Sequence, residues 1–101
     1  MDPLALKAAI RKLTIVDVDD EIKRAEKMHG QLPIADLCRV SAILTEECGE
    51  VAEASLEVGR GTGSLKHLQK EYIHVATVAL RAAGMLQPQV DEEQEKADVQ
   101  A

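Results

Sequence analysis

Residues 34–59 read IADLCRVSAILTEECGEVAEASLEVG, and this stretch decides the fold. It contains no proline, and its apolar residues recur at the three- and four-residue spacing of an α-helix. The apolar positions are Leu37, Val40, Leu44, Val51, Ala54 and Val58. The stripe is interrupted once, at Glu47. The pattern therefore predicts a helix from near Pro33 to about Val58, with a glutamate in a core position.

Two shorter helices are predicted before this segment. Asp2 followed by Pro3 is typical of a helix start, and the first helix should run to about Lys12. The second should begin among the acids at positions 17, 19 and 20 and run to residue 28 or 29, before Gly30. The nearest candidate for a strand, residues 13–18, is short and bounded by acids. The predicted fold class is therefore all-α.

The glycine-rich segment Gly59–Gly63 separates the long helix from a second long one. Ser64 is suited to cap this last helix, which should run to Gly84 or slightly beyond. The glycines favour a turn rather than a phosphate-binding loop, because no strand precedes them and the lysine of such a loop is missing. Two long helices joined by about five residues should form an antiparallel hairpin in a helical bundle.

The end of the chain differs in composition from the rest. Pro88 precedes an acidic stretch with little to bury, so residues 1–87 are predicted as a single all-α domain and residues 88–101 as a disordered tail. Five acids and one lysine in this tail account for four of the six net negative charges. No basic stripe with interleaved aromatic residues is present, so nucleic acid is not expected as a partner.

The composition predicts a soluble protein that associates with itself. Tyr72 is the only aromatic residue among 101, so the core must be aliphatic, and a second copy is expected to complete it. There is no apolar run near eighteen residues and no apolar leader, so we expect a cytoplasmic protein that does not contact membranes. Cys38 and Cys48 would lie roughly 15 Å apart along one helix, too far to bridge, and should be reduced.

Four polar side chains are expected to meet inside the hairpin. Glu47 and Glu50 come about ten residues before the turn, and Glu71 and His74 come about ten after it. Such an oxygen-rich group suits Mg²⁺, and the nitrogen of His74 would shift the preference toward Mn²⁺. Two plainer interpretations remain open: the glutamates form a solvated acidic helix face, or the histidine makes a hydrogen bond at a helix interface.

The pattern Glu46-Glu47-x-x-Glu50, followed by Glu71-x-x-His74, resembles the Glu-Glu-x-x-Glu and Glu-x-x-Asp pair of the MazG-like all-α nucleoside triphosphate (NTP) pyrophosphohydrolases. The surrounding segments ILTEECGEVAEA and LQKEYIHVATVALR are similar to the short phage and mobile-element branch of that family. The chain departs from the family pattern at His74, which stands where aspartate is usual.

The resemblance covers roughly residues 19–86 and implies both an assembly and an activity. The assembly is a helical bundle that forms a homodimer or a dimer of dimers. The activity is house-cleaning hydrolysis of an NTP to the monophosphate and pyrophosphate with Mg²⁺. Glu47, Glu50 and Glu71 would be metal ligands, joined by the histidine in the aspartate position. Glu46 would be an outer ligand or the catalytic group that orients the attacking water.

The imidazole of His74 brings no negative charge to the metal, so Mg²⁺ should bind less tightly than in the family pattern. Two non-enzymatic alternatives follow. The chain could be a catalytically degenerate module for dimerisation or partner binding, or a nucleotide sensor that does not cleave. The basic cluster of Lys23, Arg24, Lys27 and His29 is a further open case. The resemblance places Lys23, Lys27 and His29 near the phosphates of the substrate, whereas the plainer interpretation is that they complement a helix dipole.

Overall fold

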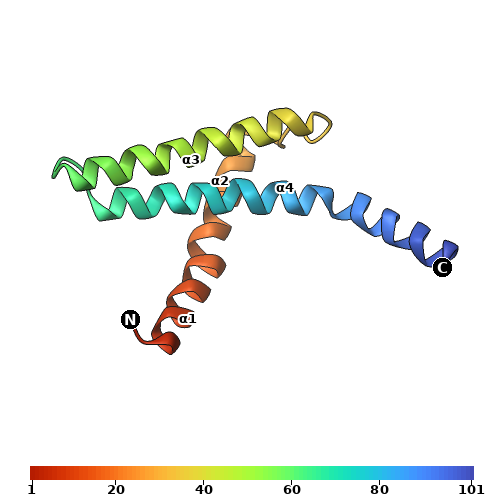
Figure 1. Ribbon diagram of the computed structural model, residues 1–101, viewed down its shortest axis with the longest axis horizontal. Helices are drawn as coiled ribbons and strands as arrows, with labels where there is room; N and C mark the ends of the chain where they lie inside the picture. Colours follow the sequence, from red (N-terminus) through yellow and green to blue (C-terminus); the bar gives the residue numbers. More distant parts are fainter.

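The computed structural model describes residues 1–101 and contains helices but no strand, which confirms the all-α prediction. Figure 1 shows the helices in chain order. They are α1 (Pro3–Lys12), the π-helix η1 (Leu13–Val18), α2 (Asp19–His29), α3 (Leu37–Gly59) and α4 (Leu65–Gln100). None of them combines the length and the apolar character that a membrane-spanning helix needs.

The first three helices form one continuous rod. It begins at Asp2, whose side chain accepts a hydrogen bond from the backbone N–H of Ala5 at 3.3 Å. The gap predicted between the first two helices is absent. Residues 13–18 contain no glycine or proline that would stop the helix, and they continue it as η1. The rod ends at Gly30, where φ is 68°, a value that glycine adopts readily and other residues rarely do.

Helices α3 and α4 form the predicted antiparallel hairpin, and they lie side by side (Figure 1). Helix α3 starts at Leu37, later than predicted, because two hydrogen bonds fold residues 32–36 into turns. The side chain of Asp36 accepts a hydrogen bond from the backbone N–H of Arg39 at 3.1 Å and so caps the helix. Ser64 caps α4 in the same way, as predicted, accepting from the N–H of His67 at 3.1 Å.

The turn of the hairpin depends on glycine, as predicted. Gly61 has φ 78°, and a Cβ atom at Gly63 would lie 2.9 Å from the Cβ of Glu57. Both the Thr62 and Gly63 N–H groups donate to the Glu57 carbonyl at 3.0 Å. Side chains at these two glycines would therefore strain or open the turn.

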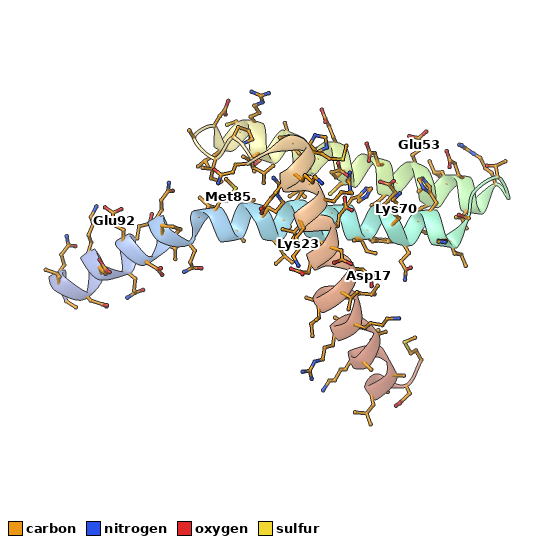
Figure 2. All side chains as sticks on the ribbon, turned by 180° about the vertical axis from the view of Figure 1, so that it is seen from behind. Asp17, Lys23, Glu53, Lys70, Met85 and Glu92 are labelled. Atoms are coloured by element: carbon orange, nitrogen blue, oxygen red, sulfur yellow. The ribbon has the colours of Figure 1, made fainter.

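The α2 end of the rod lies against the middle of the hairpin, so the molecule has the outline of a T (Figures 1 and 2). Helix α2 packs on α4, whereas α1 extends away from the hairpin. The molecule measures 57 × 34 × 25 Å. This crossing places one face of α2 over the polar centre of the hairpin.

The predicted end of the last helix is wrong. Helix α4 continues through Pro88 to Gln100, and every residue from 87 to 101 is exposed. A proline inside a helix removes one hydrogen bond and crowds the carbonyl four residues earlier, here that of Gly84. The segment beyond it is rich in helix-forming Glu, Gln, Lys and Ala, and its side chains pair along the helix. These pairs are Gln87 with Asp91 at 2.8 Å, Gln94 with Asp98 at 2.9 Å and Lys96 with Glu92 at 3.3 Å.

The core is small and its apolar members are aliphatic, as the composition predicted. The buried residues are Val18, Ala25, Leu32, Val40, Ala54 and Val78, together with the polar Glu71, Thr77 and Arg81. The accessible surface is 7692 Å², whereas a compact monomer of 11.0 kDa exposes about 5,600 Å². The radius of gyration is 16.9 Å, against about 13 Å for a compact chain of this length. A single copy therefore exposes more surface to solvent than a compact monomer of this size would.

Candidate metal centre

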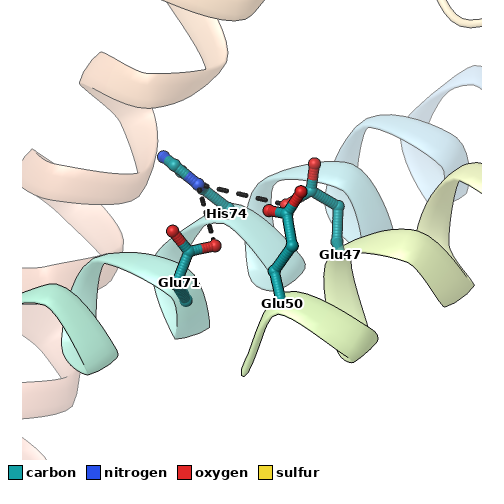
Figure 3. Close-up of side chains that lie close together, drawn as sticks. All are labelled: Glu47, Glu50, Glu71 and His74. Carbon is teal, nitrogen blue, oxygen red and sulfur yellow. Dashed lines mark ion pairs between the residues drawn. The ribbon is translucent and has the colours of Figure 1, made fainter. Parts of the chain in front are cut away.

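The four side chains predicted to meet inside the hairpin do so. Glu47 and Glu50 come from α3, and Glu71 and His74 come from α4 (Figure 3). One ligand atom from each lies within 4.8 Å of the others. The antiparallel arrangement of the two helices produces this meeting, because both pairs stand at similar distances from the turn.

Helix periodicity explains why two of the acids point inward. Glu47 lies seven residues after Val40 and seven before Ala54, both of which are buried. Similarly, Glu71 lies seven residues before the buried Val78. Residues seven apart share one helix face, so both carboxylates occupy positions that face the neighbouring helix. Glu71 is only 7% exposed, which is unusual for a carboxylate.

Three polar atoms of the cluster lack hydrogen-bond partners within the chain. The Oε2 atoms of Glu47 and Glu71 and the Nε2 atom of His74 are buried without a hydrogen bond. The His74 Nδ1 atom lies 3.6 Å from Glu71 Oε2 and 3.9 Å from Glu47 Oε2, longer than a hydrogen bond (Figure 3). Since leaving buried polar groups unpaired is costly, the arrangement favours a ligand that would pair with them.

A divalent cation fits this cluster. Mg²⁺ holds oxygen ligands at about 2.1 Å, so ligands on opposite sides of the ion are about 4.2 Å apart. The ligand atoms here are at most 4.8 Å apart, so small side-chain movements would bring them to that spacing. The buried carboxylate of Glu71, whose Oε2 atom has no hydrogen-bond partner, separates this group from an ordinary acidic surface patch.

The negative charges also affect one another. The neighbouring carboxylate of Glu71, with which Glu50 can share a proton, and then the charge of Glu47, raise the pKa of Glu50 above its usual 4.5. On α2, the hydrogen bond from Arg24 holds the pKa of Glu21 below 4.5. Without a cation, the cluster therefore retains a proton more readily than separate carboxylates would, whereas Glu21 stays ionised.

The raised pKa of Glu50 leads to an expectation for stability. Because the folded chain holds this proton more tightly than the unfolded chain does, the contribution is fully present below about pH 4.5 and is lost as the pH rises through the raised pKa. We therefore expect metal-free Glu50→Gln to melt a few degrees higher than metal-free wild type near neutral pH, and the difference to shrink as the pH falls toward 4.5. Thermal melts in chelator across that range measure it. Melting curves that keep a constant separation at every pH would contradict the expectation.

The other predicted site residues, Glu46, Lys23, Lys27 and His29, lie outside the cluster of four. Glu46 is exposed and lies outside the group of four, since it projects about 100° around α3 from Glu47. Lys23 and Lys27 are exposed, and Lys23 pairs with Asp19 at 3.0 Å. Neither lysine reaches the cavity beside the cluster, whereas His29 lines it.

This cavity, of about 540 Å³, adjoins the cluster between α2, α3 and α4. Its lining includes acidic residues, Glu21, Glu47 and Glu50, and cationic ones, Arg24, Arg39 and Arg81. The buried guanidinium of Arg81 donates a hydrogen bond to the carbonyl of Gly30 and so ties α4 to the end of α2. The cavity therefore offers positive and negative groups to one ligand.

Sequence reasoning missed Glu21, Arg39 and Arg81. A signal for Glu21 was present, because it lies three residues after Val18 and four before Ala25, both of which are buried. It therefore interrupts an apolar face, as Glu47 does.

No model of a protein family matches the chain, and neither the curated proteins nor the solved structures contain a match to it. The geometry of the cluster and its cavity is therefore the basis for a functional assignment.

Proposed function

We propose that this chain is a nucleoside triphosphate pyrophosphohydrolase that depends on Mg²⁺ or Mn²⁺ and belongs to the MazG-like all-α family, of the house-cleaning type. The observation that supports this most is the meeting of Glu47, Glu50, Glu71 and His74 across two antiparallel helices, with buried atoms that lack partners. These are the positions at which the sequence resembles the family. A solvated acidic helix face would leave Glu71 exposed, whereas it is 7% exposed.

The residues around the cavity suggest which side chains would bind the metal ion and which would bind the phosphates. The four clustered side chains would hold the ion, which when bound offsets phosphate charge and makes water a better nucleophile. Arg39 and Arg81 line the same cavity and can bind phosphate oxygens. In the metal-free protein the carboxylates would repel a triphosphate, so we expect substrate binding to require the ion. Glu46 keeps the proposed role of orienting the attacking water from outside the cluster.

The test is hydrolysis itself. We expect the purified protein to release pyrophosphate from at least one member of a panel of canonical and modified NTPs, with Mg²⁺ or Mn²⁺. Glu46→Gln should lower turnover about 10²-fold or more while leaving metal affinity unchanged, because its side chain lies outside the cluster. Pyrophosphate release and calorimetric metal titration provide the two measurements. No turnover of any nucleotide with either ion would refute the proposed activity.

A non-enzymatic role is the second candidate, and His74 favours it because imidazole replaces a charged ligand of the family pattern. A degenerate module would keep the bundle for dimerisation or partner binding and lose the ion. A nucleotide sensor would bind both ion and nucleotide without cleavage. Thermal melts separate these cases, since a ligand that binds only the folded chain raises its melting temperature. A melt unaffected by Mn²⁺ supports the degenerate module, and a nucleotide-dependent shift without product supports the sensor.

We also propose that the protein works as a homodimer or a dimer of dimers. Between Leu65 and Ala83, one exposed side of α4 carries no charge, and Gln69 is its one polar residue. We call this the α4 apolar face, and it comprises Leu65, Tyr72, Ala76, Ala79, Leu80 and Ala83. The surface in excess of a compact monomer is roughly 2,000 Å² per chain. Permanent homodimer interfaces bury about 1,000–2,500 Å² per chain, so a second copy is a suitable partner for this face.

A further inference from the structure

The His74 ring lies between two acidic groups. Its Nδ1 atom faces Glu47 and Glu71 at 3.9 and 3.6 Å, and its Nε2 atom faces Oε1 of Glu21 on α2 at 3.4 Å. A neutral imidazole has one N–H group and one lone pair, so it can donate to only one of these sides. Which side receives the proton decides which nitrogen is free to bind an ion.

Glu21 is the better fixed acceptor. Arg24 Nε lies 3.0 Å from Glu21 Oε1 and 2.9 Å from Oε2, so the arginine holds both carboxylate oxygens. Of the carboxylates that face the ring, Glu21 also lies nearest to a ring nitrogen. At 3.4 Å the Nε2–Oε1 contact is not yet a hydrogen bond, but a small rotation of the ring would make it one, and an Nε2–H group that donates to Glu21 would leave the Nδ1 lone pair facing Glu47 and Glu71. Because that lone pair would face two negative groups, a cation between them resolves the repulsion.

We propose that Glu21 is a positioning residue: it holds His74 by Nε2 so that Nδ1 can ligate a first-row transition-metal ion, in preference to Mg²⁺. This arrangement is a carboxylate–histidine–metal triad, in which the outer carboxylate fixes the tautomer and orientation of the ring. Imidazole is a ligand of first-row transition metals, and even Mn²⁺, the weakest binder among their divalent ions, accepts it more readily than Mg²⁺, which favours oxygen ligands. The inference rests on the metal site of the proposed function but not on the hydrolysis of nucleotides.

The test compares Mn²⁺ and Mg²⁺ binding by calorimetry in four proteins: wild type, Glu21→Ala, His74→Asp and Glu26→Ala. The last is a matched control, since Glu26 is an exposed acid on the same helix. Loss of an outer-shell partner typically lowers metal affinity 10- to 100-fold. We expect Glu21→Ala to show about this loss for Mn²⁺ and a smaller one for Mg²⁺, while the control matches wild type. An equal loss for both ions would mean that Glu21 acts on packing alone and would overturn the proposal.

Pulsed electron paramagnetic resonance of bound Mn²⁺ gives the second readout. Nitrogen modulation should be present in wild type and absent in His74→Asp, which should also shift preference toward Mg²⁺. This variant keeps the test decisive even where Glu21→Ala folds poorly. Manganese bound by wild type without nitrogen modulation would overturn the triad, and pyrophosphate release would still test the enzyme separately. Nitrogen-ligated manganese without cleavage of any NTP would uphold the triad and refute the enzyme.

Discussion

Glu71→Gln is expected to abolish divalent-metal binding and, with it, pyrophosphate release. Glu71 is the most buried member of the cluster, and its Oε2 atom has no partner within the chain. An amide cannot supply the negative charge that a hard cation requires, so the loss of affinity should exceed the roughly 10- to 100-fold typical of outer-shell changes. Calorimetric titration with Mn²⁺ and a pyrophosphate-release assay measure the two effects.

The same substitution should have the opposite effect on the metal-free protein. A buried unpartnered polar group costs about 1–3 kcal/mol, and a charged one costs more. Removing the charge should therefore raise the metal-free melting temperature, by roughly 4–8 °C for each kcal/mol regained. Glu93→Gln is the matched control, because it removes one exposed acid from the same helix and should change neither property. A metal-induced rise in melting temperature that persists in Glu71→Gln would show that the ion binds elsewhere.

The second large effect is expected from Ala79→Glu on the α4 apolar face. A charge at an exposed helix position of a monomer changes stability by no more than about 0.5 kcal/mol. Within an interface between two copies the same charge would be buried without a partner, which is far more costly. We expect wild type to sediment at twice 11.0 kDa or more and Ala79→Glu to sediment as a monomer of lower melting temperature.

The control for this change is Ala97→Glu, which adds the same charge to α4 in its exposed, polar end. It should leave the sedimenting mass unchanged. Analytical ultracentrifugation over a range of concentrations distinguishes the three proteins. A wild type that sediments as a monomer at every concentration would refute the proposed assembly, and an oligomeric Ala79→Glu would place its interface on another face.

The hairpin and its cluster could be predicted because helix periodicity fixes which side chains share a face. Glu47 interrupts an apolar stripe, and the short loop sets the two helices antiparallel, so the meeting with Glu71 follows from the sequence. The assignment of Glu46 rested on the resemblance rather than on periodicity, and this residue lies outside the cluster.

The inward side of α2 could be predicted in the same way, because Glu21 lies between the buried Val18 and Ala25, but the packing of α2 on α4 could not. A π-helix turn holds more residues than an α-helix turn, so η1 rotates the faces of α2 relative to those of α1 by an amount that a period of 3.6 does not give. The placement of Glu21 beside His74 depends on where α2 crosses the hairpin, which no local sequence pattern gives. At the other end of the chain, the rule that proline ends a helix failed at Pro88, where helix-forming residues follow and no packing opposes their continuation.

The scarcity of aromatic residues has a practical consequence. Tyr72 is the only intrinsic fluorophore of the chain, and it is 58% exposed on the α4 apolar face. Ultraviolet emission from this protein therefore comes from one phenol ring at the surface where we propose that a second copy binds. The intensity and polarisation of that emission should change on dilution, which makes the unlabelled protein an optical reporter of its own assembly.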